Sequence, residues 1–545
     1  MASSSSHAPL LDSPRTTKAF SFKKSLVFVS SLAALIGLIA LSTHHVIHHS
    51  LYSLNKPSVL CAHSPNPAAC IDIVSSTNST GRSPKDLFHS ILRRSLHDIR
   101  FAQTNTANIR LRVNGPLRPP LDDCLELLDL SHDRIISSIS AFSSGSFMDS
   151  RTWLSAVLTN HVTCREGLDG LPNQPIRAEL DSLTAQASAA LAVLRAIAGD
   201  NVDELGTVTD LPPWVGPAER VVLNAFSPAE LAVDVTVAKD GSGNYRTLQA
   251  AVDSAPANSK GRFTIYVKAG TYKENVQVGK NKKNITIVGD GMNATVISGS
   301  LNFVDGSTTF NSATLAAVGD GFILQDLCVE NTAGPEKHQA VAVRIGADKS
   351  VVNRCQIRGY QDTLYAHSLR QFYRDSLISG TIDYIFGNAA VVFQKCNLVA
   401  RKPLANQKNA VTAQGRTDKN QNTGTSIQDC RIVPASDLVP VKGSIPTYLG
   451  RPWKEYSRTV VMQSYIDNHV NPKGWLEWDG DFALQTLYYG EYNNYGPGAG
   501  TAGRVKWPGY HVITNPQDAV PFTVAVLIQG NEWLASTKVP FTAGL

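Results

Sequence analysis

The sequence predicts two domains: an all-α four-helix bundle followed by an all-β, right-handed parallel β-helix. The first half carries four long segments whose apolar residues recur every three or four positions, as in packed helices. From Val235 the composition shifts to Val, Ile, Thr, Gly and Asn in short alternating strands. Polar residues there recur at one-coil intervals, since Gln339 precedes Gln361 by 22 residues and Asp362 precedes Asp383 by 21. The expected boundaries are 1–50 for a cytoplasmic tail and export segment, 51–205 for the helical domain, 206–230 for a linker and 231–545 for the β-helix.

Length and charge limit the class of protein. A chain of 545 residues is too long for one ordinary core, and 43% hydrophobic with 17% charged residues is typical of globular proteins. The formal net charge is +5, and the excess lies in residues 229–545, which hold 31 basic and 26 acidic side chains. A basic surface favours a polyanionic partner, although a solvated mixed surface is the simpler explanation. No basic-aromatic motif indicates nucleic acid.

The N-terminal segment indicates export. Residues 26–41 form an apolar run, and the preceding Arg15, Lys18, Lys23 and Lys24 fit a cytoplasmic N-terminus. At 16 residues, the run is long for a signal-peptide core and short for a membrane span. We expect a signal anchor, with a cleaved signal peptide as the alternative and a buried soluble helix as a weaker third. Either export route places the rest of the chain in the secretory lumen or outside the cell.

The helical domain is expected to hold four long helices in an up-and-down bundle, at residues 84–113, 121–142, 150–168 and 176–197. An even number of cysteines in an exported chain favours disulfides, and the absence of a CxxC pair disfavours zinc. We expect Cys61 and Cys70 to close a short helical hairpin before the bundle. Cys124 and Cys164 would then join two of the bundle helices. An inert helical spacer is the alternative for this half.

The second half is expected to be a solenoid of β-coils. Residues 247–255 predict a short helix that closes the first coil, and a β-sandwich would need turn signals every ~8–12 residues. Cys328 and Cys355 are 27 residues apart, about one coil, and Cys396 and Cys430 are 34 apart, so each pair can meet on neighbouring coils. Strands are expected at 264–268, 285–288, 315–318, 340–345, 351–357, 371–378, 390–394, 411–414 and 459–463.

The one-coil steps bring Gln339, Gln361, Asp362 and Asp383 onto neighbouring coils of one face, ~4.8 Å apart along the axis. Neighbouring carboxylates push each other's pKa values apart, so that one can attack while the other donates a proton. Two neutral amides can donate hydrogen bonds to a developing oxyanion. This grouping suits ester chemistry, although Asp and Gln at coil corners also serve simply to close turns.

Four segments resemble plant pectin methylesterases, in order and at family-like spacing, over about residues 235–545. The helical half, with its cysteine spacing, resembles the plant invertase/pectin methylesterase inhibitor fold, which this family often carries as a pro-region. Such pro-regions are usually cut at a pair of basic residues, but here Arg220 stands alone in ERVVL. The four motifs are GRFTIYVKAGTYKENVQV (261–278), GYQDTLYAH (359–367), ISGTIDYIFG (378–387) and LGRPWKEYSRTVVMQS (449–464).

The resemblance implies a role for each site residue. Asp383 is the nucleophile on the methyl ester of pectin, and Asp362 is the proton donor and later the base. Gln361, with Gln339, stabilises the oxyanion. Arg451 bonds Asp383 and keeps its pKa low. An acyl-enzyme anhydride forms between the two steps, with no cofactor or metal.

Substrate contacts are implied for Trp453 in GRPW and for Thr309. The aromatic residues Tyr365, Phe386 and Trp475 lie near the motifs and could stack on sugar rings, although aromatic residues more often serve packing. The implied partners are pectin, an intramolecular inhibitor domain and a processing protease. The implied location is the secretory pathway and the cell wall, with membrane anchoring before processing.

Two other classes of function remain open. A β-helix glycosidase or lyase acting on pectin also uses carboxylates, although it does not need the glutamine pair. A non-enzymatic inhibitor or interaction protein would need only the helical half. Sequons at Asn78, Asn284 and Asn293 could be glycosylated in an exported chain or remain unused.

Overall fold

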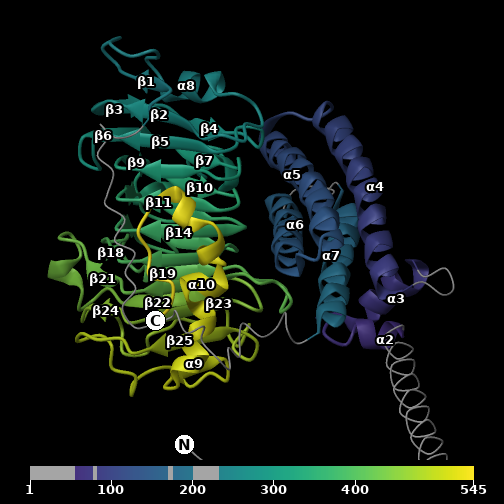
Figure 1. Cartoon of the computed structure of the whole chain (residues 1–545). Helices are drawn as coiled ribbons and strands as arrows, with labels where there is room; N and C mark the ends of the chain where they lie inside the picture. Colours follow the sequence, from purple (N-terminus) through teal and green to yellow (C-terminus); the bar gives the residue numbers. More distant parts are fainter. Residues whose placement is uncertain (1–55, 78–82, 170–175, 200–231) are drawn as a thin grey trace, which may run out of the picture. The chain divides into compact units, whose positions relative to one another are not determined.

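The computed structural model describes residues 56–77, 83–169, 176–199 and 232–545 (Figure 1). The predicted export segment, the sequon at Asn78 and the linker with Arg220 lie outside these ranges. Within the described ranges, no helix combines the length and apolar character that a membrane span needs.

The four predicted bundle helices are confirmed. Helix α4 begins with a capping box, in which the Ser83 hydroxyl accepts from the backbone N–H of Asp86 and the Asp86 carboxylate accepts from that of Ser83. Helix α6 is buried at every position from 154 to 162, because it packs on more than one side. The helices are α2 (Pro57–Leu60), α3 (Pro67–Thr77), α4 (Pro84–Arg110), α5 (Arg118–Ser143), α6 (Phe147–Gly167) and α7 (Arg177–Ala198).

Both disulfides predicted for the helical half are confirmed. Cys61–Cys70 joins the end of α2 to α3, and Cys124–Cys164 joins α5 to α6. The second bridge fixes the two helices whose side chains contact the β-helix most, as described below.

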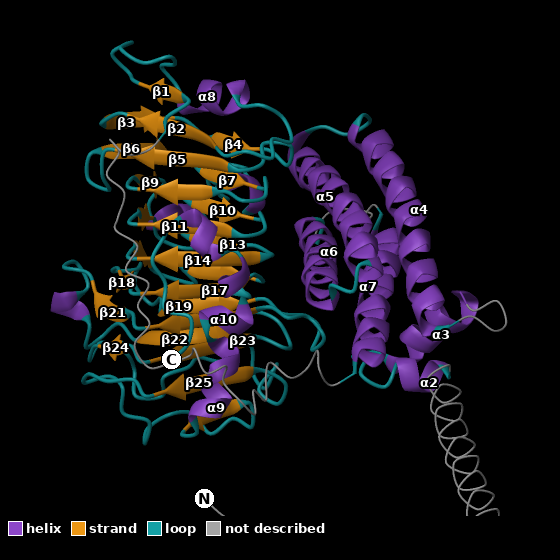
Figure 2. Ribbon diagram, in the orientation of Figure 1, coloured by secondary structure: helices purple, strands orange, loops and turns teal. Residues whose placement is uncertain are grey.

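The second half is a right-handed parallel β-helix of three sheets, as predicted, with strands stacked coil on coil (Figure 2). The longest sheet contains β1 (Val235–Val237), β2 (Phe263–Val267), β5 (Ile285–Gly289), β8 (Ile323–Gln325), β11 (Ser350–Asn353), β14 (Arg370–Arg374), β17 (Ala390–Gln394), β20 (Gly424–Gln428), β23 (Arg458–Met462), β25 (Tyr488–Tyr492) and β26 (Tyr510–Ile513). The site sheet contains β4 (Val276–Val278), β7 (Leu315–Ala317), β10 (Val343–Ile345), β13 (Leu364–Ala366), β16 (Ile385–Gly387), β19 (Asn409–Gln414) and β22 (Thr447–Pro452). The third contains β3 (Gly270–Lys273), β6 (Thr295–Gly299), β9 (Cys328–Asn331), β12 (Gln356–Arg358), β15 (Leu377–Gly380), β18 (Asn397–Ala400), β21 (Arg431–Pro434) and β24 (Tyr465–Ile466).

Two helical segments cover the solenoid. Helix α8 (Leu248–Ser254) begins with Thr247 as its N-cap, and its buried residues join the core at the first coil, as predicted. The C-terminal segment was not predicted; it contains α9 (Pro516–Ala519) and α10 (Val524–Leu527). Its apolar side chains pack on the outer face of the longest sheet, which covers apolar surface there.

Two predicted strands each turn a corner. The run 351–357 divides into β11 and β12, and the run 371–378 divides into β14 and β15. The corners carry Arg354 and Asp375 in the left-handed region, with φ of 50° and 47°. The residue types are similar on both sides of each bend, so the sequence of these runs does not show where the chain turns.

The two disulfides predicted for the β-helix are wrong, because all four cysteines are free and buried. Cys328 pairs in register with Gln356, so Cys355 is one residue out of step and its side chain points to the opposite face. Cys396 and Cys430 do occupy the same position on neighbouring coils, directly before Asn397 and Arg431. They form no S–S bond: the Cys396 thiol lies 3.5 Å from Gln394 O, and the Cys430 thiol lies 3.3 Å from Gln428 O and accepts from the Cys396 backbone N–H at 3.3 Å.

The two described sequons differ in accessibility. Asn293 is exposed, whereas the Asn284 amide donates to the Ser259 carbonyl at 3.0 Å in a left-handed corner with φ 57°. A glycan at Asn284 would break that bond, so Asn293 is the better placed of the two.

Candidate active site

The two aspartates lie at matching corners of adjacent coils. Leu364 on β13 pairs with Ile385 on β16, and Asp362 and Asp383 each stand two residues before those partners. Both have left-handed backbones, with φ of 61° and 51°, as Arg354 and Asp375 have at other corners. They are 8% and 5% exposed. The predicted stacking of the pair is therefore confirmed.

Arg451, on β22, forms hydrogen bonds with only one of the two carboxylates. Its Nε donates to Asp383 Oδ1 at 2.8 Å and its second nitrogen donates to Oδ2 at 2.7 Å, which is a bidentate pair. Burial raises the pKa of Asp383, and Arg451 opposes that rise without reversing it. The expectation of a low pKa for Asp383 is thus wrong in its net direction, because burial outweighs the arginine.

Asp362 has the more strongly perturbed carboxyl group. Burial raises its pKa well above the usual range, the negative charge of Asp383 raises it further, and Arg451 only partly opposes both effects. The bidentate arginine therefore separates the pair into one carboxylate that ionises more readily and one that holds its proton.

An outward-facing ladder of side chains surrounds the pair on the site sheet. Register places Arg344, Tyr365, Phe386, Ala413 and Arg451 side by side on successive strands. The rings of Tyr365 and Phe386 stack with centroids 4.1 Å apart. This row of side chains thus has two aromatic rings in its middle and an arginine at each end.

Trp453 completes this surface. Its ring meets Tyr365 edge-on at 6.5 Å and Phe386 at 5.9 Å. Trp475, in contrast, is fully buried, stacks on Tyr489 and donates to Glu491 at 3.2 Å, so it belongs to the core. Trp478, which the sequence analysis missed, lies on the site, with the Arg451 guanidinium 4.4 Å from its ring centroid. It is three residues from Trp475 in the same WLEW segment.

The glutamines and Thr309 line the same cavity as the carboxylates. Gln361 directly precedes Asp362, so its backbone position is set by the same corner. The N–H of Ala340, the residue after Gln339, donates to the Gln361 carbonyl, just as the N–H of Asp362 donates to the Ile382 carbonyl on the next coil. The structure therefore brings together around one cavity all seven predicted catalytic and substrate-binding residues: Thr309, Gln339, Gln361, Asp362, Asp383, Arg451 and Trp453.

The cavity has a second wall, which the helical domain forms with residues that the sequence did not single out. It measures about 860 Å³, and residues from the ends of α5 and α6 line the side opposite the carboxylates. On this wall, Asp123 accepts from the Asn311 amide, and burial raises its pKa to about 7. Glu126 pairs with Arg344 at 3.4 Å, and Glu166 pairs with Lys454. Nothing in the helical periodicity of α5 or α6 distinguishes these acids from solvated ones.

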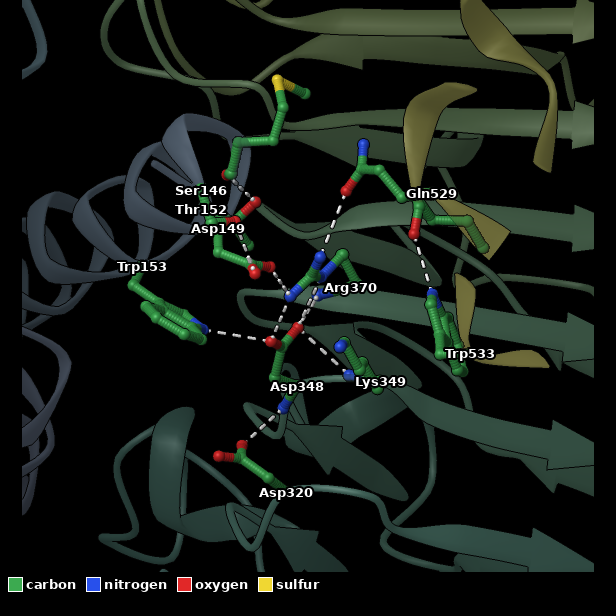
Figure 3. A network of polar contacts seen from close by, with 12 residues as sticks. Ser146, Asp149, Thr152, Trp153, Asp320, Asp348, Lys349, Arg370, Gln529 and Trp533 are labelled. Carbon is green, nitrogen blue, oxygen red and sulfur yellow. Dashed lines mark hydrogen bonds and ion pairs between the residues drawn. The ribbon is translucent and has the colours of Figure 1, made fainter. Parts of the chain in front are cut away.

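A buried ion network continues this contact away from the cavity (Figure 3). Arg370 on β14 binds Asp348 through two nitrogens, at 3.0 and 2.7 Å, and Asp149 of α6 at 2.7 Å. Its remaining nitrogen donates to Gln529 of the C-terminal segment at 3.2 Å. Trp153 of α6 donates to Asp348 at 3.1 Å. Arg370 thus links the helical bundle, the β-helix and the C-terminal segment.

Fold and cavity together define a parallel β-helix protein with a buried, in-register carboxylate pair and a preceding helical domain. The chain belongs to the pectinesterase family: the model of that family, described as "Pectinesterase", matches residues 234–531. A second family model, "Plant invertase/pectin methylesterase inhibitor", matches residues 57–193.

Relatives match along almost the whole chain. "Pectinesterase 2.2" of Solanum lycopersicum is 52% identical over 98% of this chain and 98% of its own length. "Pectinesterase/pectinesterase inhibitor 18" of Arabidopsis thaliana is 48% identical over 99% of both chains. Among solved structures, "Pectin methylesterase from Carrot" is 58% identical, with a TM-score of 0.58, over 59% of this chain and 100% of its own.

Proposed function

We propose that this chain hydrolyses the methyl esters of cell-wall pectin and releases pectate and methanol. One observation carries the proposal: two stacked, buried aspartates of which Arg451 grips only Asp383. Family membership and the names of the relatives support the reaction class. The separation of the two carboxyl groups supports one as nucleophile and the other as acid.

In the first step, Asp383 attacks the ester carbonyl while ionised, which is the state that Arg451 favours. Gln361, with Gln339, donates hydrogen bonds to the oxyanion that forms. The bond to the methoxy group breaks, and Asp362 gives its proton to the departing methanol. An anhydride between Asp383 and the galacturonate carboxyl group remains.

In the second step, the ionised Asp362 takes a proton from water, which attacks the anhydride. The bond to Asp383 breaks, Asp383 leaves as a carboxylate, and Asp362 is again protonated. Each cycle consumes one water and one ester and yields one methanol and one carboxylic acid. No metal ion enters any of these steps.

Sugar rings would be held by the aromatic surface of Tyr365, Phe386 and Trp453, with Thr309 as a further contact. Arg344 and Lys454, which bind carboxylates of the bundle, would be available to pectate once the bundle is removed. The basic excess of residues 229–545 suits such a polyanion.

The helical domain would act as an intramolecular inhibitor, because its α5 and α6 lie over the carboxylate pair. The segment 26–41 would direct the chain into the secretory pathway, as a signal anchor or a cleaved signal peptide. A protease would then cut in the linker 206–230, inefficiently because Arg220 lacks a basic neighbour. N-terminal sequencing of the secreted protein tests this route.

The reaction is tested by incubating residues 229–545 with highly esterified pectin and measuring methanol, reducing ends and viscosity. Methanol release at constant chain length supports an esterase. New reducing ends and a rapid fall in viscosity without methanol would instead indicate a glycosidase or lyase.

A further inference from the structure

The helical domain covers the candidate active site without filling it. The cavity of about 860 Å³ has the carboxylate pair on one wall and Pro119, Pro120 and Gly167 on the other. The described ranges contain no hydrogen bond from a bundle side chain to Asp362, Asp383 or Arg451. The helical domain therefore covers the catalytic groups without forming hydrogen bonds to them.

The contacts that hold the roof lie around the catalytic centre. On one side, Glu126 pairs with Arg344 at 3.4 Å; on another, Glu166 pairs with Lys454. Between them, Thr163 and His367 are 3.1 Å apart. A long polymer cannot lie across the aromatic surface while these contacts are made.

The cavity nevertheless opens to solvent. Its lining includes Phe303, which is 55% exposed, and Trp478, which is 37% exposed, together with the exposed Pro116 and Asp169. A cavity of this volume is within the range that holds a drug-sized ligand, which corresponds to about two or three sugar rings.

We propose that the uncut chain already hydrolyses methyl esters of short galacturonate oligomers, while it rejects polymeric pectin. This inference rests on the proposed function and uses the same chemistry, with one water consumed and one methanol released per ester. The helical domain then selects substrate by size rather than switching the catalytic groups off.

The test compares the uncut chain with residues 229–545, which contain all the described strands of the β-helix. The carrot structure, covered in full by 59% of this chain, is a solved relative of about that length. Each is assayed for methanol release from fully methyl-esterified trigalacturonate and from highly esterified pectin. We expect kcat/KM on the trimer to agree within about fivefold between the two forms, and kcat/KM on pectin to fall at least about 100-fold in the uncut chain.

Other outcomes overturn the inference in distinct ways. Equal fractional losses on both substrates would mean that the helical domain simply dissociates part of the time. An uncut chain inactive on the trimer, beside an active cut form, would mean that the cavity is closed in solution. If residues 229–545 release no methanol from either substrate, the proposed function itself fails.

Gly167 provides a direct probe of the cavity. Its backbone accepts a side chain, and an added Cβ would lie 3.9 Å from Pro120 Cβ, so larger residues would extend into the space. In the uncut chain, Gly167→Ala, Gly167→Leu and Gly167→Trp should lower trimer turnover progressively. Gly443→Trp should leave trimer turnover unchanged, because Gly443 is exposed and an added Cβ would meet no atom within 4 Å outside its chain neighbours. Unchanged turnover in a folded Gly167→Trp protein shows that trimers do not use the cavity.

Discussion

The β-helix and the helical bundle place their functional side chains by different means. In the β-helix, Asp362 and Asp383 repeat one corner on consecutive coils, so strand register alone sets their separation. In the bundle, Asp123 and Glu166 lie on outer helix surfaces and acquire their roles only through contact with the other domain. The spacing of residues along the β-helix therefore predicts which side chains form its site. The sequence of a bundle helix does not show which of its side chains will contact another domain.

From this difference we expect substitutions in the β-helix site to change the rate of ester hydrolysis. Substitutions on the bundle should change only the binding of the bundle to the β-helix. The largest effect should come from Asp383→Asn in residues 229–545. It removes the attacking carboxylate and leaves a neutral amide of similar shape, so kcat on esterified pectin should fall to background with the fold intact by circular dichroism.

Asp375→Asn is the matched control for this substitution, because Asp375 is also an aspartate in a left-handed corner, on a coil edge outside the cavity. It should keep kcat close to wild type. Substantial turnover in a folded Asp383→Asn protein would falsify the assignment of the nucleophile.

Asp362→Asn should cost less. It removes general acid–base assistance, which typically contributes ~10²–10⁴ in rate, while Asp383 and the oxyanion donors remain. Methanol release should stay measurable and lose its dependence on the ionisation of Asp362. If Asp362→Asn were as inactive as Asp383→Asn, the division of roles between the two carboxyl groups would need to be abandoned.

Arg451→Lys should have an intermediate to small effect that depends on pH. The lysine keeps the charge but loses the bidentate fork, so it lowers the pKa of Asp383 less effectively than arginine does. A higher pKa means that less Asp383 is ionised in acid, and the acid limb of the kcat profile should move to higher pH. A profile that merely scales down, with no displacement, would assign Arg451 a role in binding only.

The smallest effect on chemistry, and the clearest on docking, should come from Asp123→Asn. Burial under the β-helix raises the pKa of Asp123 from 3.8 to about 7, so docking takes up a proton. Docking is thus unpenalised below pH ~4 and weakens by up to about tenfold per pH unit between ~4 and ~7. Asparagine should remove this dependence.

The measurement is inhibition of residues 229–545 by the separately added bundle, between pH 4 and 8, for both forms. Glu126→Gln is the matched control, because it removes a different carboxylate of the bundle, the one that pairs with Arg344. An unchanged pH dependence in Asp123→Asn would assign the effect to another group.

The same contrast explains what the sequence could predict. The step of 21 residues correctly predicted that Asp362 stacks on Asp383, because the coil length is nearly constant there. A register error of one residue could not be seen in the sequence, and it led to the wrong pairing of Cys328 with Cys355, whose side chains face opposite ways. The acids that contact the β-helix could not be found, since helix periodicity separates buried from exposed positions but not docked from solvated ones.

The Arg370 network bears on the stability of the β-helix if the helical domain were removed. When the helical domain departs, Arg370 loses Asp149 but keeps both bonds to Asp348 and the bond to Gln529. No orphan cation is left at this position, which would otherwise cost several kcal/mol. Arg370 would therefore need no replacement partner if the helical domain were removed.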